Sequence, residues 1–201
     1  MMRGPIVTIQ TAQDELFGTM SYMLKVVVAG ETYVGKTALI QRFVADRFVT
    51  GTRNTIGVDF FLKQLSADEV TGLEPDEELH LQVWDVSGEQ RFREILPLYS
   101  SGTQGLVLCF DTQENLEQLW EWERTLQFLI PPPTPRILLK TKCDLGYKVD
   151  QAKVEEFKTQ FHCVGPFESS AKEGFGVRQA FAQLANEIFA TINKSDVEQP
   201  S

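Results

Sequence analysis

One motif constrains this chain more than any other: it reads GETYVGKT over residues 30–37 and fits the pattern G-x-x-x-x-G-K-[S/T]. The apolar run 23–28 precedes it as a buried strand, and residues 38–48 follow it at helical spacing. A glycine-containing turn between a strand and a helix N-terminus presents backbone N–H groups to polyphosphate oxygens. We therefore predict a nucleotide-binding loop formed by Gly30, Val34, Gly35, Lys36, Thr37 and Ala38. In this motif the lysine reaches the β- and γ-phosphates and the threonine hydroxyl ligates Mg²⁺.

Length and charge narrow the classes of protein to which the chain can belong. Its 201 residues suffice for one sizeable core but not for two comfortable domains. The net charge of −9 argues against nucleic acid as a partner. Six acids and no lysine or arginine lie in 66–80, so much of this charge belongs to one segment. This acidic segment is either a solvated surface loop or a partner-binding arm, and we expect it to be dispensable for folding because loop length costs little stability.

Cysteine usage and hydropathy favour a cytoplasmic protein. The three cysteines have no metal-ligand spacing, and Cys109 lies inside an apolar run that is typical of a core strand. No segment is long and apolar enough to span a bilayer, and residues 1–20 lack the apolar region of a signal peptide. The last residues contain no cysteine, so we expect no direct lipid anchor in this chain. Membrane association is then expected only through a partner or a truncated tail.

Short apolar runs alternate with helical patterns along the chain. We predict strands at 23–29, 57–65, 79–85, 105–111, 136–141 and about 163–168, and helices at 36–47, 92–99, 115–130, 150–161 and 175–193. Asn115 and Gln118 fit a capping box at the start of the third helix. The alternation predicts an α/β fold with a six-stranded, mostly parallel sheet and helices on both faces. Strands 57–65 and 79–85 follow each other directly, so they should form a hairpin that makes one strand antiparallel. We expect an N-terminal extension (1–20), one domain (21–193) and a C-terminal tail (194–201).

Four further segments follow the loop in an informative order: NTIGVDF at 54–60, WDVSGEQRF at 84–92, TKCD at 141–144 and ESSAK at 168–172. Each sits where a strand ends, at the sheet edge where ligands bind in open α/β folds. With these five motifs the chain resembles the small GTPases of the Ras superfamily, most closely the Rab type, over roughly residues 22–193. The resemblance implies the P-loop small-GTPase fold, bound GTP or GDP with Mg²⁺, and slow GTP hydrolysis.

The resemblance also implies roles for single residues at the phosphates and the metal. Thr37 and Thr55 ligate Mg²⁺, and Asp85 holds it through a water. The backbone of Thr55 senses the γ-phosphate, to which the Gly88 N–H also donates. The catalytic positions are Lys36, Thr55 and Glu89.

At the guanine base, the resemblance implies a second group of residues. Phe48 packs against the base and Lys142 lies along it. Asp144 accepts from the N1–H and 2-amino donors, which an adenine lacks, so ATP leaves this carboxylate unpaired. Ser170, Ala171 and Lys172 form the loop after the last strand, which also contacts the base. There the Ala171 N–H donates to guanine O6.

Several positions depart from the family pattern. Glu89 stands where the family carries the glutamine that orients the attacking water, and its charge near the γ-phosphate is unfavourable. Arg53 either offsets that charge or is a solvated loop residue. Tyr33 occupies a loop position that is usually small. Thr141 replaces the usual asparagine, and we expect this change to weaken the tie between the base loop and the phosphate-binding loop.

We interpret the chain as a monomeric Rab-like switch whose effector, exchange-factor and GTPase-activating partners bind through 50–60 and 86–99. Phe60, Trp84 and Tyr99 match the aromatic trio that Rab-type proteins present to effectors, although they could equally be core between these two segments. Two alternatives stay open. The first is a catalytically impaired scaffold that stays GTP-bound, and the second is an enzyme that uses ATP.

Overall fold

The computed structural model describes residues 20–51 and 55–197. The predicted extension 1–20, apart from Met20, lies outside the described residues, as do Arg53 and the last four residues of the predicted tail 194–201. The last helix, α7, runs from Val177 to Val197, so it continues four residues beyond the predicted boundary at 193.

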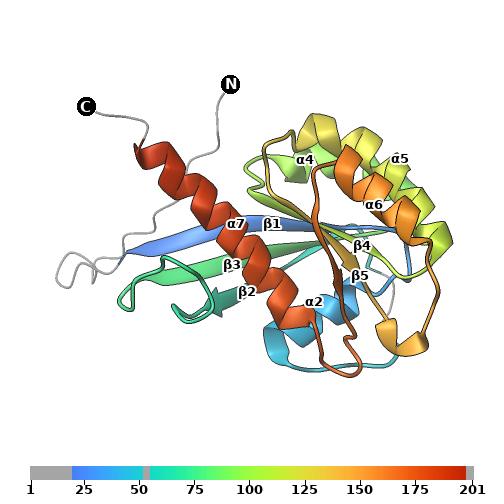
Figure 1. The fold of residues 1–201 in the computed structure, drawn as a ribbon, viewed down its shortest axis with the longest axis horizontal. Helices are drawn as coiled ribbons and strands as arrows, with labels where there is room; N and C mark the ends of the chain where they lie inside the picture. The colour runs from blue at the N-terminus through green and yellow to red at the C-terminus, as the bar shows by residue number, and fades with distance from the viewer. Residues whose placement is uncertain (1–19, 52–54, 198–201) are drawn as a thin grey trace.

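A six-stranded sheet organises the molecule (Figure 1). Its spatial order is β2-β3-β1-β4-β5-β6, and only β2 runs antiparallel, against β3. The strands are β1 (Ser21–Ala29), β2 (Val58–Leu65), β3 (Glu78–Val86), β4 (Gly105–Phe110), β5 (Arg136–Lys140) and β6 (Val164–Glu168). Every residue of β4 is buried, as expected for a parallel strand that is covered on both faces. The predicted mostly parallel sheet with one antiparallel strand is confirmed.

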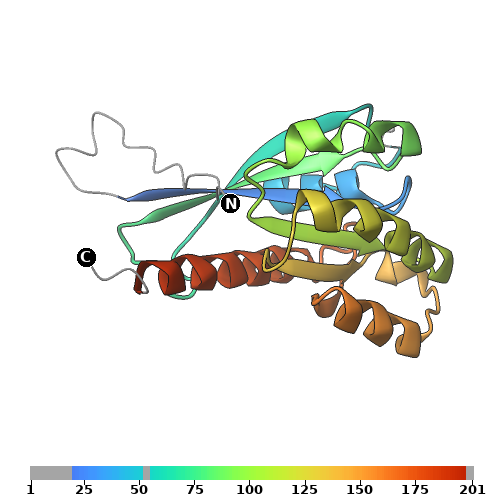
Figure 2. The ribbon, with the colours of Figure 1, turned by 90° about the horizontal axis from the view of Figure 1, so that it is seen from above.

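Helices cover both faces of this sheet (Figure 2). They are α2 (Lys36–Ala45), α3 (Gln90–Arg93), α4 (Leu96–Ser100), α5 (Gln113–Leu129), the 3₁₀ turn η1 (Cys143–Leu145), α6 (Gln151–Gln160) and α7. The capping box predicted at Asn115 is wrong. Helix α5 begins two residues earlier, because the Thr112 side chain caps it by accepting from the Asn115 N–H at 3.3 Å.

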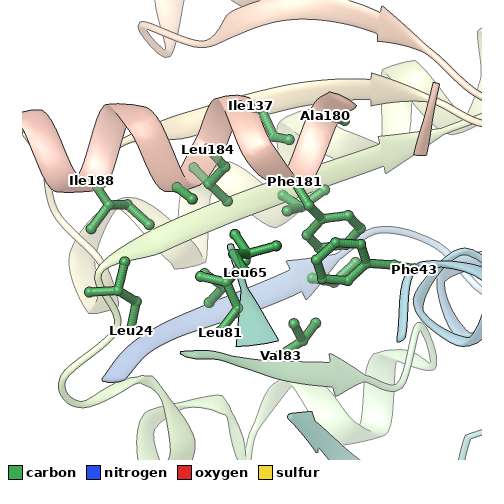
Figure 3. Close-up of a cluster of buried hydrophobic side chains, with 14 of the residues drawn as sticks. Leu24, Phe43, Leu65, Leu81, Val83, Ile137, Ala180, Phe181, Leu184 and Ile188 are labelled. Carbon is green, nitrogen blue, oxygen red and sulfur yellow. The ribbon is translucent and has the colours of Figure 1, made fainter. Parts of the chain in front are cut away.

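Alternate residues of β1 enter two separate cores. Val26 and Val28 pack with α2 and α7, whereas Val27 and Ala29 pack on the other face with α4, α5 and α6. In the first core Phe43 of α2 stacks on Phe181 of α7, with ring centroids 4.0 Å apart and planes 12° apart (Figure 3). This stack fixes α2, and therefore the loop before it, against the body of the protein.

The acidic segment, called here the acidic arm (66–78), packs on α7. Val70 and Leu73 are buried in the first core, and burying such side chains stabilises a fold by ~1.5–3 kcal/mol each. Glu69 pairs with Arg178 at 2.6 Å, and the Thr71 N–H donates to Asn186 Oδ1 at 2.7 Å. The expectation of a solvated surface loop is therefore wrong, because two apolar residues inside the polar stretch anchor it to the body of the protein.

Two further expectations concern the cysteines and the membrane. Cys109 is buried in the central strand β4, as predicted, and burial raises the pKa of its thiol to about 12. Cys109, Cys143 and Cys163 are all free thiols. Within the described part of the chain, no helix has the length and apolar character that crossing a membrane requires.

Candidate functional site

The site is built on the loop between β1 and α2. Gly30 has a φ of +143°, and a Cβ there would lie 2.3 Å from the Cys109 carbonyl oxygen, so only glycine fits. Gly35 has a φ of +97° and precedes the first residue of α2. Val34 is fully buried and anchors the loop to the first core, while Ala38 lies in the first helical turn. The loop therefore delivers a free helix N-terminus to the sheet edge, where backbone N–H groups favour anions.

Lys36 is held inside this loop. Its side chain is buried, and Nζ donates to the carbonyl oxygens of Gly30 and Glu31, both at 2.8 Å. Burial lowers the pKa of the ammonium, and the charge of Asp85 opposes that shift. An ammonium has three donors, so one remains for a phosphate oxygen at this position.

Three oxygen-bearing side chains converge at the end of β3. Asp85 Oδ2 accepts from Thr37 Oγ1 at 2.5 Å and from Thr55 Oγ1 at 3.1 Å, and the two hydroxyls lie 2.8 Å apart. Asp85 is wholly buried, and this burial raises the pKa of its carboxyl. Its second oxygen, Oδ1, has no hydrogen-bond partner among the described residues. A cluster of hard oxygens with one buried carboxylate oxygen open fits Mg²⁺.

No competing metal centre is found in the part of the chain that the structure describes. There, no group of three or more His, Cys, Asp or Glu side chains is arranged to hold an ion.

Thr141 begins the predicted base-binding segment 141–144 and links it to the phosphate-binding loop. Its hydroxyl, wholly enclosed, donates to the Val34 carbonyl oxygen at 2.5 Å and lies 3.2 Å from the Phe110 carbonyl oxygen. The Thr141 hydroxyl therefore ties the base loop to the phosphate-binding loop, and the weakening expected relative to asparagine stays a prediction. Lys142, with a φ of +52°, donates from Nζ to the Tyr33 carbonyl oxygen and to Asp111 Oδ2 at 2.8 Å.

Asp144 is exposed on η1, and a hydrogen bond from Ser170 orients its side chain. Ser170, fully buried after β6, donates from its hydroxyl to Asp144 Oδ1 at 2.6 Å. The same hydroxyl accepts from the Glu173 N–H at 3.0 Å, which fixes the turn that carries Ala171. Lys172 is exposed and pairs with Glu173 at 3.5 Å. Ser170 thus acts on Asp144 through its side chain, a role that the sequence did not distinguish.

Phe48 lies three residues past the end of α2 and is 37% exposed. The structure therefore brings together Lys36, Thr37, Thr55 and Asp85, which are predicted to hold the phosphates and the metal. Asp144 and Ser170, predicted to bind the base, contact each other as a second group, and Phe48 is partly exposed.

Gly88 and Glu89 follow β3 on the phosphate side. A Cβ on Gly88 would lie 2.2 Å from the Thr32 backbone nitrogen, so its backbone packs directly on the phosphate-binding loop. The Glu89 carboxylate pairs with Arg91 Nε at 2.7 Å, and its side chain is 28% exposed. The side chain at the position of the water-orienting glutamine is thus paired with a residue of α3, the helix that follows it.

Sequence reasoning missed one cluster beside this segment. Glu31 of the phosphate-binding loop accepts from Arg93 Nη2 and from Trp122 Nε1, the latter at 2.8 Å. The Arg93 guanidinium also lies 4.5 Å from the centre of the Trp122 ring. The three residues come from the loop after β1, from α3 and from α5, so no local pattern could have revealed their contact.

The aromatic trio forms a partly exposed row. Ring centroids of Phe60 and Trp84 lie 6.0 Å apart, and those of Trp84 and Tyr99 5.7 Å apart. Phe60 is 65% exposed, whereas the other two are half-buried. Lys25 supports the row from β1, because its Nζ lies 4.2 Å from the Trp84 ring centre and donates to the Tyr99 carbonyl oxygen at 2.5 Å. The trio is therefore neither simple core nor fully exposed surface.

Comparison with known proteins places this geometry in a family. Residues 25–190 match the Ras family. The chain is 31% identical over 179 residues to Ras-related protein Rab-8B of Homo sapiens, covering 88% of this chain and 83% of that protein. It is 33% identical over 171 residues to Ras-related protein Rab-13 of Rattus norvegicus, covering 83% of this chain and 80% of that protein. With these matches and the fold described above, the chain belongs to the Ras family of small GTPases and is of the Rab type.

Proposed function

We propose that this protein is a Rab-like molecular switch that binds GTP or GDP with Mg²⁺ and hydrolyses GTP slowly. The observation that carries the proposal is the convergence of Thr37, Thr55 and Asp85 beside the buried Lys36 ammonium. Mg²⁺ neutralises charge on the phosphates when bound. The two hydroxyls would ligate it, and the open Asp85 Oδ1 would accept from its water.

Guanine selectivity belongs to the same proposal. Two observations support it: the Ser170 hydroxyl donates to one carboxylate oxygen of Asp144, and the Asp144 side chain is exposed. Its carboxylate would pair with the two donors of the guanine edge, while the backbone N–H of Ala171 would serve O6. ATP offers no such donor pair, so binding it would leave the carboxylate desolvated and unpaired.

Switching would act through Thr55 and Gly88, because both lie at the metal and phosphate side. A γ-phosphate would order 50–60 and 86–99, and its loss would release them. Effectors, exchange factors and GTPase-activating proteins would bind this surface, in which the row of Phe60, Trp84 and Tyr99 supplies aromatic contact area. We assign these functions to a monomeric domain at 21–193 that takes part in vesicle trafficking.

A scaffold that stays GTP-bound is the alternative, and one observation favours it. The Glu89 carboxylate is paired with Arg91 at 2.7 Å and cannot donate a hydrogen bond while ionised. Multiple-turnover phosphate release from GTP, measured with ATP in parallel, separates the possibilities. Slow release from GTP alone supports the switch, GTP binding without release supports the scaffold, and comparable release from ATP contradicts both.

A further inference from the structure

We propose that Arg42 is a positioning residue for guanine-nucleotide retention, because it fastens the base loop to the segment that carries Phe48. This inference rests on the proposed function. Arg42 lies near the end of α2, and its side chain is only 18% exposed. Its hydrogen bonds to the base loop go to backbone carbonyl oxygens, so we expect its effect to pass through backbone geometry.

The base loop is held on one side by Arg42. Its Nε donates to the Ala171 carbonyl oxygen at 2.7 Å, and Nη2 donates to the Lys172 carbonyl oxygen at 3.1 Å. A peptide group that is fixed at its carbonyl oxygen has little freedom to turn, so the neighbouring backbone N–H groups of the loop are also oriented. Ser170 fixes the other side of this loop through Asp144, as described above.

The same guanidinium holds the start of the next segment. Nη1 donates to Asp46 at both its carbonyl oxygen and Oδ1, each at 3.0 Å, and the Asp46 N–H returns a bond to the Arg42 carbonyl oxygen at 3.0 Å. Asp46 has a φ of +50°, a left-handed turn that redirects the chain toward Phe48 two residues later. One side chain therefore links the two segments that are expected to flank the guanine.

Arginine suits this position better than any other residue. Four of its five N–H donors are used, and they point in the fixed directions of a planar fork. Lysine keeps the charge but cannot reach both loops at once. Arg178 provides a matched comparison, since it lines the same surface groove as Arg42 but pairs with Glu69 of the acidic arm instead.

The test measures the rate of GDP release from the full chain, using fluorescently labelled GDP and Mg²⁺. We expect Arg42→Gln to accelerate release at least tenfold, Arg42→Lys to give an intermediate rate, and Arg178→Gln to leave the rate unchanged. The melting temperature of each variant shows whether it is folded. If Arg42→Gln does not fold, the release rate of Arg42→Lys is used for the comparison with wild type instead. An unchanged rate in a folded Arg42 variant overturns the inference.

A double-mutant cycle with Asp144→Ala separates positioning from general loosening of the fold. If Arg42 acts by orienting the base loop, the double variant releases GDP more slowly than the product of the two single effects predicts. If the double variant releases GDP as fast as the product of the two single effects predicts, Arg42 acts independently of base recognition, and this result contradicts the inference. Failure of the wild-type chain to bind GDP overturns the proposed function as well, whereas tight wild-type binding with unaffected Arg42 variants overturns this inference alone.

Discussion

The base edge and the phosphate edge of this site each carry a substitution relative to the family pattern, and the structure treats the two differently. At the base edge Thr141 stands for asparagine, yet its hydroxyl still donates to Val34 at 2.5 Å, across the two loops. At the phosphate edge Glu89 stands for glutamine, and its carboxylate turns to Arg91 at 2.7 Å. Thr141 thus contacts the phosphate-binding loop across the site, whereas Glu89 contacts a neighbour in its own segment.

The difference indicates that nucleotide binding should tolerate a single substitution better than GTP hydrolysis does. Under the proposed function, nucleotide binding would depend on many groups, because Ser170 contacts Asp144, Thr141 contacts the phosphate-binding loop, and two hydroxyls contact Asp85. Hydrolysis would rely more heavily on one side chain, at position 89, that must both accept from water and donate to the transition state. We therefore expect this chain to retain nucleotide well and to turn it over slowly.

Removal of the metal should produce the largest effect. Chelation of Mg²⁺ should accelerate GDP release about a hundredfold or more, equivalent to about 2.8 kcal/mol, because Asp85 is left buried beside the phosphates without its counter-charge. Thr37→Asn should shift preference from GTP to GDP, while Thr159→Asn, on the exposed face of α6, should change nothing. If the rate of GDP release does not change on chelation, the assignment of a metal site to Thr37, Thr55 and Asp85 is wrong.

Deletion of the base contact comes next. Asp144→Ala should weaken GDP binding at least tenfold, about 1.4 kcal/mol, and Asp144→Asn should move preference toward xanthine nucleotides. Calorimetric titration measures both, with Asp76→Ala in the exposed part of the acidic arm as the control. Unchanged GDP affinity in Asp144→Ala would show that the base edge lies elsewhere.

The tie made by Thr141 should have a moderate effect. Thr141→Val keeps the shape but removes the donor to the Val34 carbonyl oxygen, which costs about 1 kcal/mol and corresponds to roughly fivefold faster GDP release. Thr141→Asn should restore the rate, and Thr159→Val controls for loss of a hydroxyl elsewhere. If Thr141→Val matches wild type, the two edges do not differ in the way described above.

The smallest effect is expected at Glu89. Glu89→Gln regains an amide donor and loses the pairing with Arg91, so single-turnover GTP hydrolysis should rise about threefold, roughly 0.6 kcal/mol. Glu94→Gln, an exposed acid in the same segment, is the matched control. A slower Glu89→Gln variant would indicate that the carboxylate itself takes part, and the phosphate edge would then be adapted rather than weakened.

The sequence predicted those parts of the molecule that local patterns determine. The six strands, the P-loop and the residues at each strand end follow from hydrophobic runs and motif spacing. The start of α5 was misplaced because Thr112 and Asn115 are both acceptable caps, and only the backbone path decides between them.

Contacts between distant segments could not be predicted in this way. Val70 and Leu73 are two apolar residues in an acidic stretch, and only their burial against α7 shows that they anchor it. Arg42 meets Ala171 across 129 positions, and Glu31 meets Arg93 across 62. Such contacts depend on how the helices pack against the sheet. Short sequence patterns carry no information about that packing.

Competition between nucleotides is the most direct test of the proposed guanine-nucleotide site. Fluorescently labelled GDP is bound to the full chain in Mg²⁺, and unlabelled GDP, GTP and ATP are titrated against it. We expect GDP and GTP to displace the label at comparable concentrations, whereas ATP should fail to displace it even at a large excess. Displacement by ATP at the same concentrations, or no binding of the label at all, would contradict a guanine-nucleotide site at this edge of the sheet.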